Sequence, residues 1–123
     1  MDLQLGSANL VYKHLGFLAE EYGMRCSFDL LPNTLGVDDP TYVYSFYNEN
    51  GCFSVTEVAQ RAEWDCYTSE AYSIDVRNRM DKRIDQRSYI KMSIFTARSF
   101  LKLTAKKIKT QLHESHCFWG IQV

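Results

Sequence analysis

The spacing of apolar residues changes twice along this chain, and these two changes constrain its fold more than any other feature. Residues 7–22 place apolar side chains three and four positions apart, with Ser7 suited to begin a helix and Gly23 suited to end it. Helical spacing returns at about residue 83 and predicts a second helix over 83–113, which could break near Ser88. The apolar stripe of this second helix comprises Ile90, Ile94, Ala97, Leu101, Ala105, Ile108 and Leu112.

Between the two helical segments, apolar and polar residues alternate as they do in half-buried strands. Segments 42–47 and 52–58 flank Asn48-Glu49-Asn50-Gly51, and because Asn-Gly accepts positive φ at low cost, they predict a β-hairpin. Further strands are predicted over 25–30, over 63–68 and, as a short addition, over 73–76. Strands that follow one helix and precede another indicate a single α+β domain over residues 1–123. We expect an antiparallel sheet of three to five strands, with the N-terminal helix and the long C-terminal helical segment packed on one side.

The net charge of −1 hides a strong polarity of charge along the chain. Residues 1–75 carry twelve acidic and three basic residues, whereas residues 76–123 carry eleven basic and three acidic residues. The basic residues Lys91, Arg98, Lys102 and Lys109 share one flank of the predicted C-terminal helix, and Lys106 lies nearby. Such a flank is typical of phosphate contacts, but the chain as a whole is not basic and its aromatic residues lie in the acidic half, which disfavours nucleic acid as the partner.

The tail from Cys117 to Val123 is too apolar to remain in water, so we expect it to pack back on the domain. We also expect Phe118 and Trp119 to cover a second apolar side of the C-terminal helix. That side carries Met92, Phe95 and Leu103.

No segment predicts a membrane span or a secretory signal. The apolar runs are far shorter than the ~18 to 20 residues that a spanning helix needs, and Met1–Gly6 lacks a basic stretch followed by an apolar one. A cytoplasmic location is therefore expected, with reduced thiols. The cysteines are Cys26, Cys52, Cys66 and Cys117, and the first three fall in predicted strands, where packing is the favoured role.

Catalytic motifs are not evident, so we expect no catalytic residues, no cofactor and no enzyme activity. The glycines form neither a phosphate-binding loop nor a nucleophile elbow. The acidic neighbours of Cys66 disfavour a reactive thiolate. His113, His116 and Cys117 are close enough in sequence to suggest metal ligands, but a fourth ligand is not evident and histidines are common at helix ends. His14 is expected to pack at the margin of the first helix.

The acidic half combines aromatic side chains with carboxylates, which is what a protein-binding surface needs: apolar anchors and charges that steer the partner. Most of these aromatic residues could equally form the core, and since a sheet has two faces both roles can hold for different residues. Glu63 and Asp65 are expected on one face of a strand because side chains alternate. The predicted binding residues are Asp38, Asp39, Tyr47, Glu49, Glu57, Glu63, Trp64, Asp65 and Glu70.

The order of these segments resembles that of bacterial immunity proteins, which neutralise polymorphic or contact-dependent growth-inhibition toxins. The resemblance covers about the first 70 residues and depends on Glu21-Tyr22-Gly23, the aromatic hairpin strands and Glu63-Trp64-Asp65-Cys66-Tyr67. It implies a cytoplasmic protein without catalysis that binds one cognate toxin domain, and an acidic surface would suit a basic nuclease toxin. The basic C-terminal helix departs from this pattern. A monomer is expected. A nucleic-acid-associated regulator and a small enzyme with an unrecognised site remain open alternatives.

Overall fold

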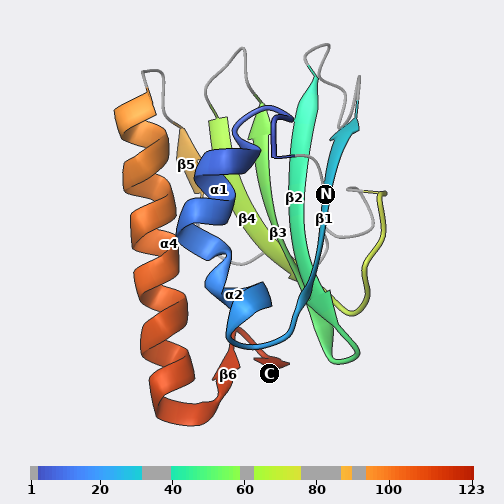
Figure 1. Cartoon of the computed structure of the whole chain (residues 1–123), viewed down its shortest axis with the longest axis vertical. Coiled ribbons are helices and arrows are strands. Elements are labelled where there is room, and N and C mark those ends of the chain that lie inside the picture. The colour runs from blue at the N-terminus through green and yellow to red at the C-terminus, as the bar shows by residue number, and fades with distance from the viewer. Residues whose placement is uncertain (1–2, 32–39, 59–62, 76–86, 90–93) are drawn as a thin grey trace.

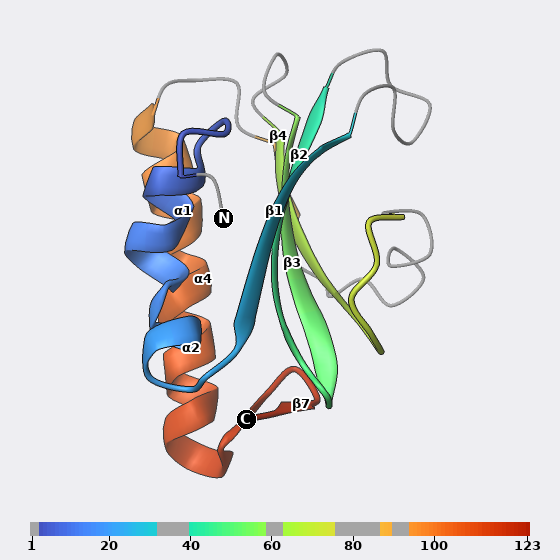
Figure 2. The same ribbon diagram turned by 45° about the vertical axis from the view of Figure 1, so that its right-hand side comes forward.

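The computed structural model describes residues 3–31, 40–58, 63–75, 87–89 and 94–123. In this part of the chain, helices cover one face of a twisted sheet (Figure 1, Figure 2). The elements in chain order are α1 (Ala8–Leu15), α2 (Phe17–Glu20), β1 (Arg25–Leu31), β2 (Thr41–Asn48), β3 (Gly51–Val58), β4 (Glu63–Ser69), β5 (Arg87–Tyr89), α4 (Ile94–Ser115), β6 (Cys117–Phe118) and β7 (Ile121–Gln122). No helix among these residues is long and apolar enough to cross a membrane.

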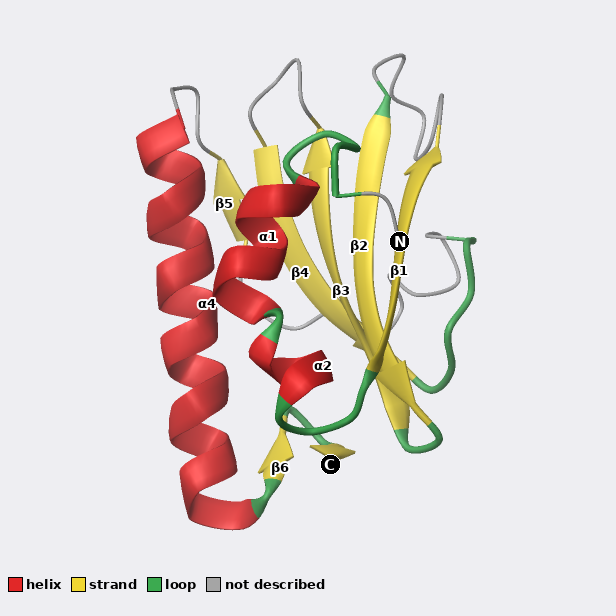
Figure 3. Ribbon diagram, in the orientation of Figure 1, coloured by secondary structure: helices red, strands yellow, loops and turns green. Residues whose placement is uncertain are grey.

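The main sheet has five strands in the order β1-β2-β3-β4-β5, and every neighbouring pair is antiparallel (Figure 3). The predicted α+β class and antiparallel sheet are confirmed, and β2 and β3 form the predicted hairpin. The turn, however, is not made by an asparagine with positive φ. The Asn48 side chain accepts a hydrogen bond of 2.7 Å from the Asn50 backbone N–H instead, which closes the turn locally.

The N-terminal helical segment is two helices, not the single one predicted. α1 and α2 meet at Gly16, where an added Cβ would collide with the carbonyl of Tyr12 and approach its ring to 2.9 Å. The segment ends as predicted at Gly23, whose φ of +70° allows Met24 to donate its N–H to the Leu18 carbonyl at 3.0 Å.

The predicted beginning of the C-terminal helix is wrong. Arg87–Tyr89 form the edge strand β5, because their backbone pairs with Glu63–Asp65 of β4. The helix α4 begins at Ile94 instead, and Ile90 and Lys91 lie outside the described residues. The short strand predicted over 73–76 is not formed by residues 73–75, and Val76 is outside the described part.

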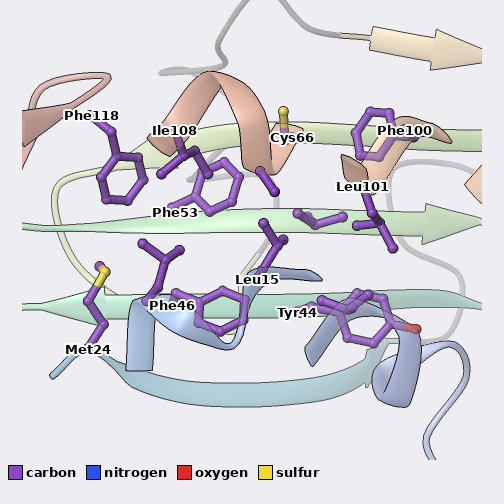
Figure 4. Packing of buried hydrophobic residues seen from close by; sticks show 14 of the residues in the cluster. Leu15, Met24, Tyr44, Phe46, Phe53, Cys66, Phe100, Leu101, Ile108 and Phe118 are labelled. Carbon is purple, nitrogen blue, oxygen red and sulfur yellow. The ribbon is translucent and has the colours of Figure 1, made fainter. Parts of the chain in front are cut away.

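The main core lies between the helices and the sheet (Figure 4). Tyr44 and Phe46 of β2 and Phe53 of β3 face the helices, where they meet Leu15 of α1 and Ile108 of α4. Each of these five side chains is fully buried. The predicted stripe on α4 is confirmed where it is described, since its members Ala97, Leu101, Ala105, Ile108 and Leu112 are all buried.

The tail packs on the domain as predicted, with Phe118 fully buried and Ile121 only 3% exposed. It does not cover the second apolar side of α4, however, since Leu103 remains 51% exposed. The side chains of Met92 and Phe95 lie outside the described part. The tail binds the hairpin turn instead, where the side-chain amides of Asn48 and Asn50 each donate to the Gln122 carbonyl at 3.0 Å.

Candidate functional site

A cluster of tyrosines lies at the hairpin end of the sheet, on the face away from the helices. The rings of Tyr47 (β2) and Tyr72, which follows β4, stack with centroids 4.5 Å apart and planes 21° apart. The Tyr72 hydroxyl donates to Asp29 Oδ2 at 2.7 Å and lies 2.7 Å from Ser27 Oγ, both on β1. The segment that carries Tyr72 runs along the face of the sheet that points away from the helices (Figure 2). The Tyr47–Tyr72 pair is therefore fixed by hydrogen bonds as well as by stacking.

A groove of about 550 Å³ lies beside this pair. Tyr22, Arg25, Tyr47 and Glu49 line it, together with the asparagines of the turn and Val123. Tyr22 is 38% exposed and stands at the end of the helical segment, because the left-handed Gly23 turns the chain there into β1. We call Tyr22, Tyr47, Tyr72, Asp29 and Glu49 the tyrosine end. It presents aromatic faces and carboxylate oxygens, groups that suit binding a polar or basic surface.

The structure does not gather the predicted binding residues at one place. Tyr47, Glu49 and Glu70 lie at the hairpin end, where Tyr47 and Ser69 both pair with Cys52. Glu63 lies at the opposite end of the sheet. It pairs with Val58, which is six residues along β3 from Cys52, so Glu63 is roughly 20 Å from the hairpin end. Asp65 shares the outer face with Glu63, as predicted, but is only 9% exposed. Asp38 and Asp39 lie outside the described residues.

Glu57 faces the helices and is only 9% exposed. One carboxylate oxygen accepts a hydrogen bond of 2.7 Å from the Tyr44 hydroxyl, and the other accepts one of 2.8 Å from Ser7 Oγ. The Tyr44 oxygen in turn accepts the Ser7 backbone N–H at 2.8 Å. Burial and the Glu57 carboxylate raise the pKa of Tyr44, so its hydroxyl stays protonated and remains a donor.

These three residues attach the beginning of α1 to the sheet, and we call them the Ser7–Tyr44–Glu57 latch. Ser7 stands at the predicted N-cap position, but its side chain makes no capping hydrogen bond because the hydroxyl donates to Glu57 instead. Glu57 therefore supports the fold and is not displayed to a partner.

Trp64 is also a core residue in this structure, with 3% of its surface exposed. Its ring stacks at 6.4 Å on Tyr44 and packs at 5.8 Å against Phe100 of α4. Trp64 is therefore too buried in this conformation to act as the predicted anchor for a partner.

The cysteines in the strands are packing residues, as predicted. Cys52 and Cys66 are fully buried, and Cys26 is half-buried. Burial raises the pKa of the Cys66 thiol to about 12, which leaves almost no thiolate at neutral pH.

Cys66 should therefore resist alkylation in the folded protein. At pH 8 its pKa allows roughly a thousandfold less thiolate than an ordinary cysteine has, and burial slows reagent access further. Iodoacetamide labelling followed by mass spectrometry checks this, with the half-exposed Cys117 as the internal reference. Alkylation of Cys66 at the rate of Cys117 in native buffer would contradict the packing role.

The histidine-cysteine group at the end of α4 does not converge. His113 and His116 are exposed, Cys117 is half-exposed, and His116 has a left-handed φ of +56° where the helix gives way to β6. Among the described residues, no three His, Cys, Asp or Glu side chains are placed to hold a metal ion.

The sequence did not assign Tyr22, Asp29 or Tyr72 to the site. Tyr22 belongs to the apolar stripe of the first helix in sequence, and Tyr72 is 43 residues from Asp29. The nearest signal in the sequence is that Tyr72 is one of the aromatic residues interleaved with carboxylates in the acidic half, a pattern that does not show which side chains meet.

Comparisons of this chain with protein-family models, with curated proteins and with solved structures find no match.

Proposed function

We propose that this chain is an immunity-type protein that binds a basic protein partner, a cognate toxin domain, through its tyrosine end. The observation that carries the proposal is the stacked Tyr47–Tyr72 pair, fixed by Asp29 beside a groove. Tyrosines contribute strongly to protein interfaces because they bury a large area with few rotatable bonds. A pair that is already ordered loses little conformational entropy when it binds.

Exposed carboxylates lie next to the residues of the tyrosine end along the chain, beside one exposed arginine, Arg25, in the groove lining. Glu20, Glu21 and Glu49 are exposed, and Glu70 is exposed next to the strand that leads to Tyr72. Negative charges around an aromatic centre attract a basic partner over long range and accelerate its encounter. The resemblance to immunity proteins supplies the partner class, a basic nuclease-type toxin, and implies that the chain acts in the cytoplasm. A monomer is favoured separately from this resemblance.

Variants of the tyrosine end test the proposal once the partner has been isolated from source cells with the tagged chain. Tyr47→Ala should weaken binding by about 2–4 kcal/mol, mainly by faster dissociation, since it removes the central anchor. Glu49→Lys combined with Glu21→Lys should mainly slow association. That effect should fade at high salt, because the Debye length falls from about 10 Å at 0.1 M to about 3 Å at 1 M.

The matched control is Glu114→Lys, which reverses an exposed carboxylate on α4 and should leave both rates nearly unchanged. Circular dichroism of each variant verifies that the fold is retained. Equal binding by the parent and by Tyr47→Ala, or recovery of nucleic acid alone, would contradict the proposal.

A further inference from the structure

A second groove, of about 650 Å³, lies between α1 and α4 on the helical side of the molecule. Its lining includes Lys13 and His14 from α1 and Lys102, Lys106 and Lys109 from α4. The spacing of the α4 residues explains the row: positions 102, 106 and 109 are four and three apart, so they share one side of the helix. α1 runs beside this part of α4 in both ribbon views (Figure 1, Figure 2).

The charge of this groove is poorly balanced. Glu114 is the acidic residue in its lining, against four lysines. Within the described part of the chain, Lys13, Lys102 and Lys106 form no ion pair, and Lys109 lies 4.7 Å above the Phe17 ring. Like charges gathered around a concave surface repel one another and raise the local concentration of anions.

His14 adds an imidazole to the lining of this groove. Its Nε2 atom is buried and has no hydrogen-bond partner among the described residues. Burial lowers the pKa of His14, and so do the positive charges of Lys13 on its own helix and of Lys102, Arg98 and Lys109 on α4. His113 and Glu114 of α4 line the same groove. An unsatisfied buried polar atom costs free energy that a ligand oxygen would recover.

We propose that this groove binds a small, multiply charged phosphate-bearing anion, with the lysines holding its oxygens and the imidazole of His14 meeting it from below. The volume is in the range of small-ligand sites. A duplex or an extended strand lying over the lysines would leave the buried Nε2 without a hydrogen-bond partner. The chain also has a net charge of −1, whereas nucleic-acid-binding domains are typically basic. The site is separate from the tyrosine end and does not depend on the proposed function.

Calorimetric titration of the full chain with pyrophosphate at low ionic strength tests the site. Lys102→Gln and Lys106→Gln should each weaken binding about tenfold, since each removes a charge-assisted contact. Lys107→Gln is the matched control, because Lys107 is exposed on the same helix but is not part of the groove lining. The affinity of this variant for pyrophosphate should stay within about twofold of that of the parent.

Three results of this titration would overturn the proposal. They are no binding of pyrophosphate at millimolar concentration, an equal loss in Lys107→Gln, and tighter binding of a short oligonucleotide that displaces pyrophosphate. The last result would assign the groove to nucleic acid.

The titration of His14, followed by NMR of its imidazole, is a second readout. A bound anion stabilises the protonated ring, so saturating sulfate, which keeps its charge over this pH range, should raise the pKa of His14. By linkage, sulfate should bind more tightly as the pH falls through that pKa. A midpoint that sulfate does not move would show that the anion does not reach His14 and would overturn the assignment.

Discussion

Replacing Tyr44 by Phe is expected to lower the free energy of unfolding by about 2–4 kcal/mol, although only one oxygen atom is removed. That oxygen donates to the Glu57 carboxylate and accepts the Ser7 N–H, at 2.7 and 2.8 Å. Its loss leaves the buried Glu57 carboxylate with one partner fewer and the Ser7 N–H without its acceptor, so that only the bond from Ser7 Oγ to Glu57 still attaches the beginning of α1. Urea unfolding followed by circular dichroism measures the change.

Tyr42→Phe is the control for this prediction. Tyr42 lies two residues away on the same face of β2, is only partly buried and stacks on Tyr44 at 6.5 Å. Loss of its hydroxyl should change the unfolding free energy by less than about 0.5 kcal/mol. If Tyr44→Phe is as stable as Tyr42→Phe, the Ser7–Tyr44–Glu57 latch does not stabilise the fold. Glu57→Lys, which places a cation in that buried position, should be more damaging than either change.

Replacing Phe118 by Ala is expected to lower the free energy of unfolding by about 3–5 kcal/mol. Phe118 is fully buried and meets Phe53 edge to face, with ring centroids 5.7 Å apart. Phe53 also stacks at 5.6 Å on Trp119, so removal of residues 117–123 should expose Phe53 and promote aggregation. Denaturant titration of Phe118→Ala and light scattering of the truncated chain are the measurements.

Gln122→Ala separates the role of the tail's apolar residues from that of its backbone. The Gln122 side chain is exposed, and the turn asparagines use its carbonyl, which the substitution keeps. This variant should therefore be nearly as stable as the parent. A truncated chain that remains soluble and as stable as the parent would show that the tail is not part of the core.

Much of the fold could be predicted because the spacing of apolar residues is a local property of the sequence. The hairpin from Thr41 to Val58 and the buried stripe from Ala97 to Leu112 follow from the spacing of apolar residues, and the end of the first helical segment follows from Gly23. β5 could not be predicted in this way. Residues Arg87–Tyr89 form a strand because the edge of β4 offers them backbone partners, which is a tertiary effect that local propensity does not report.

The site was harder to predict, because the alternation of side chains along a strand defines two faces of the sheet but does not show which face the helices cover. Both faces of the sheet carry aromatic side chains: Tyr44 and Trp64 point to the helices, whereas Tyr47 stacks with Tyr72 outside. Cross-strand pairing of Glu57 with Trp64 places both on the inner face, and the sequence alone did not reveal this. The tyrosine end also needs Tyr72 to return to β1, a contact across 43 residues.

Site-specific photo-crosslinking in source cells tests the proposed binding surface most directly. A photoreactive amino acid would be placed at Tyr22, which is 38% exposed and lines the groove of the tyrosine end, or at Leu103, which is 51% exposed on α4. The proposal predicts capture of one basic protein from position 22 and no capture of that protein from position 103. Capture of the same protein from position 103 alone, or of nucleic acid in place of protein, would contradict it.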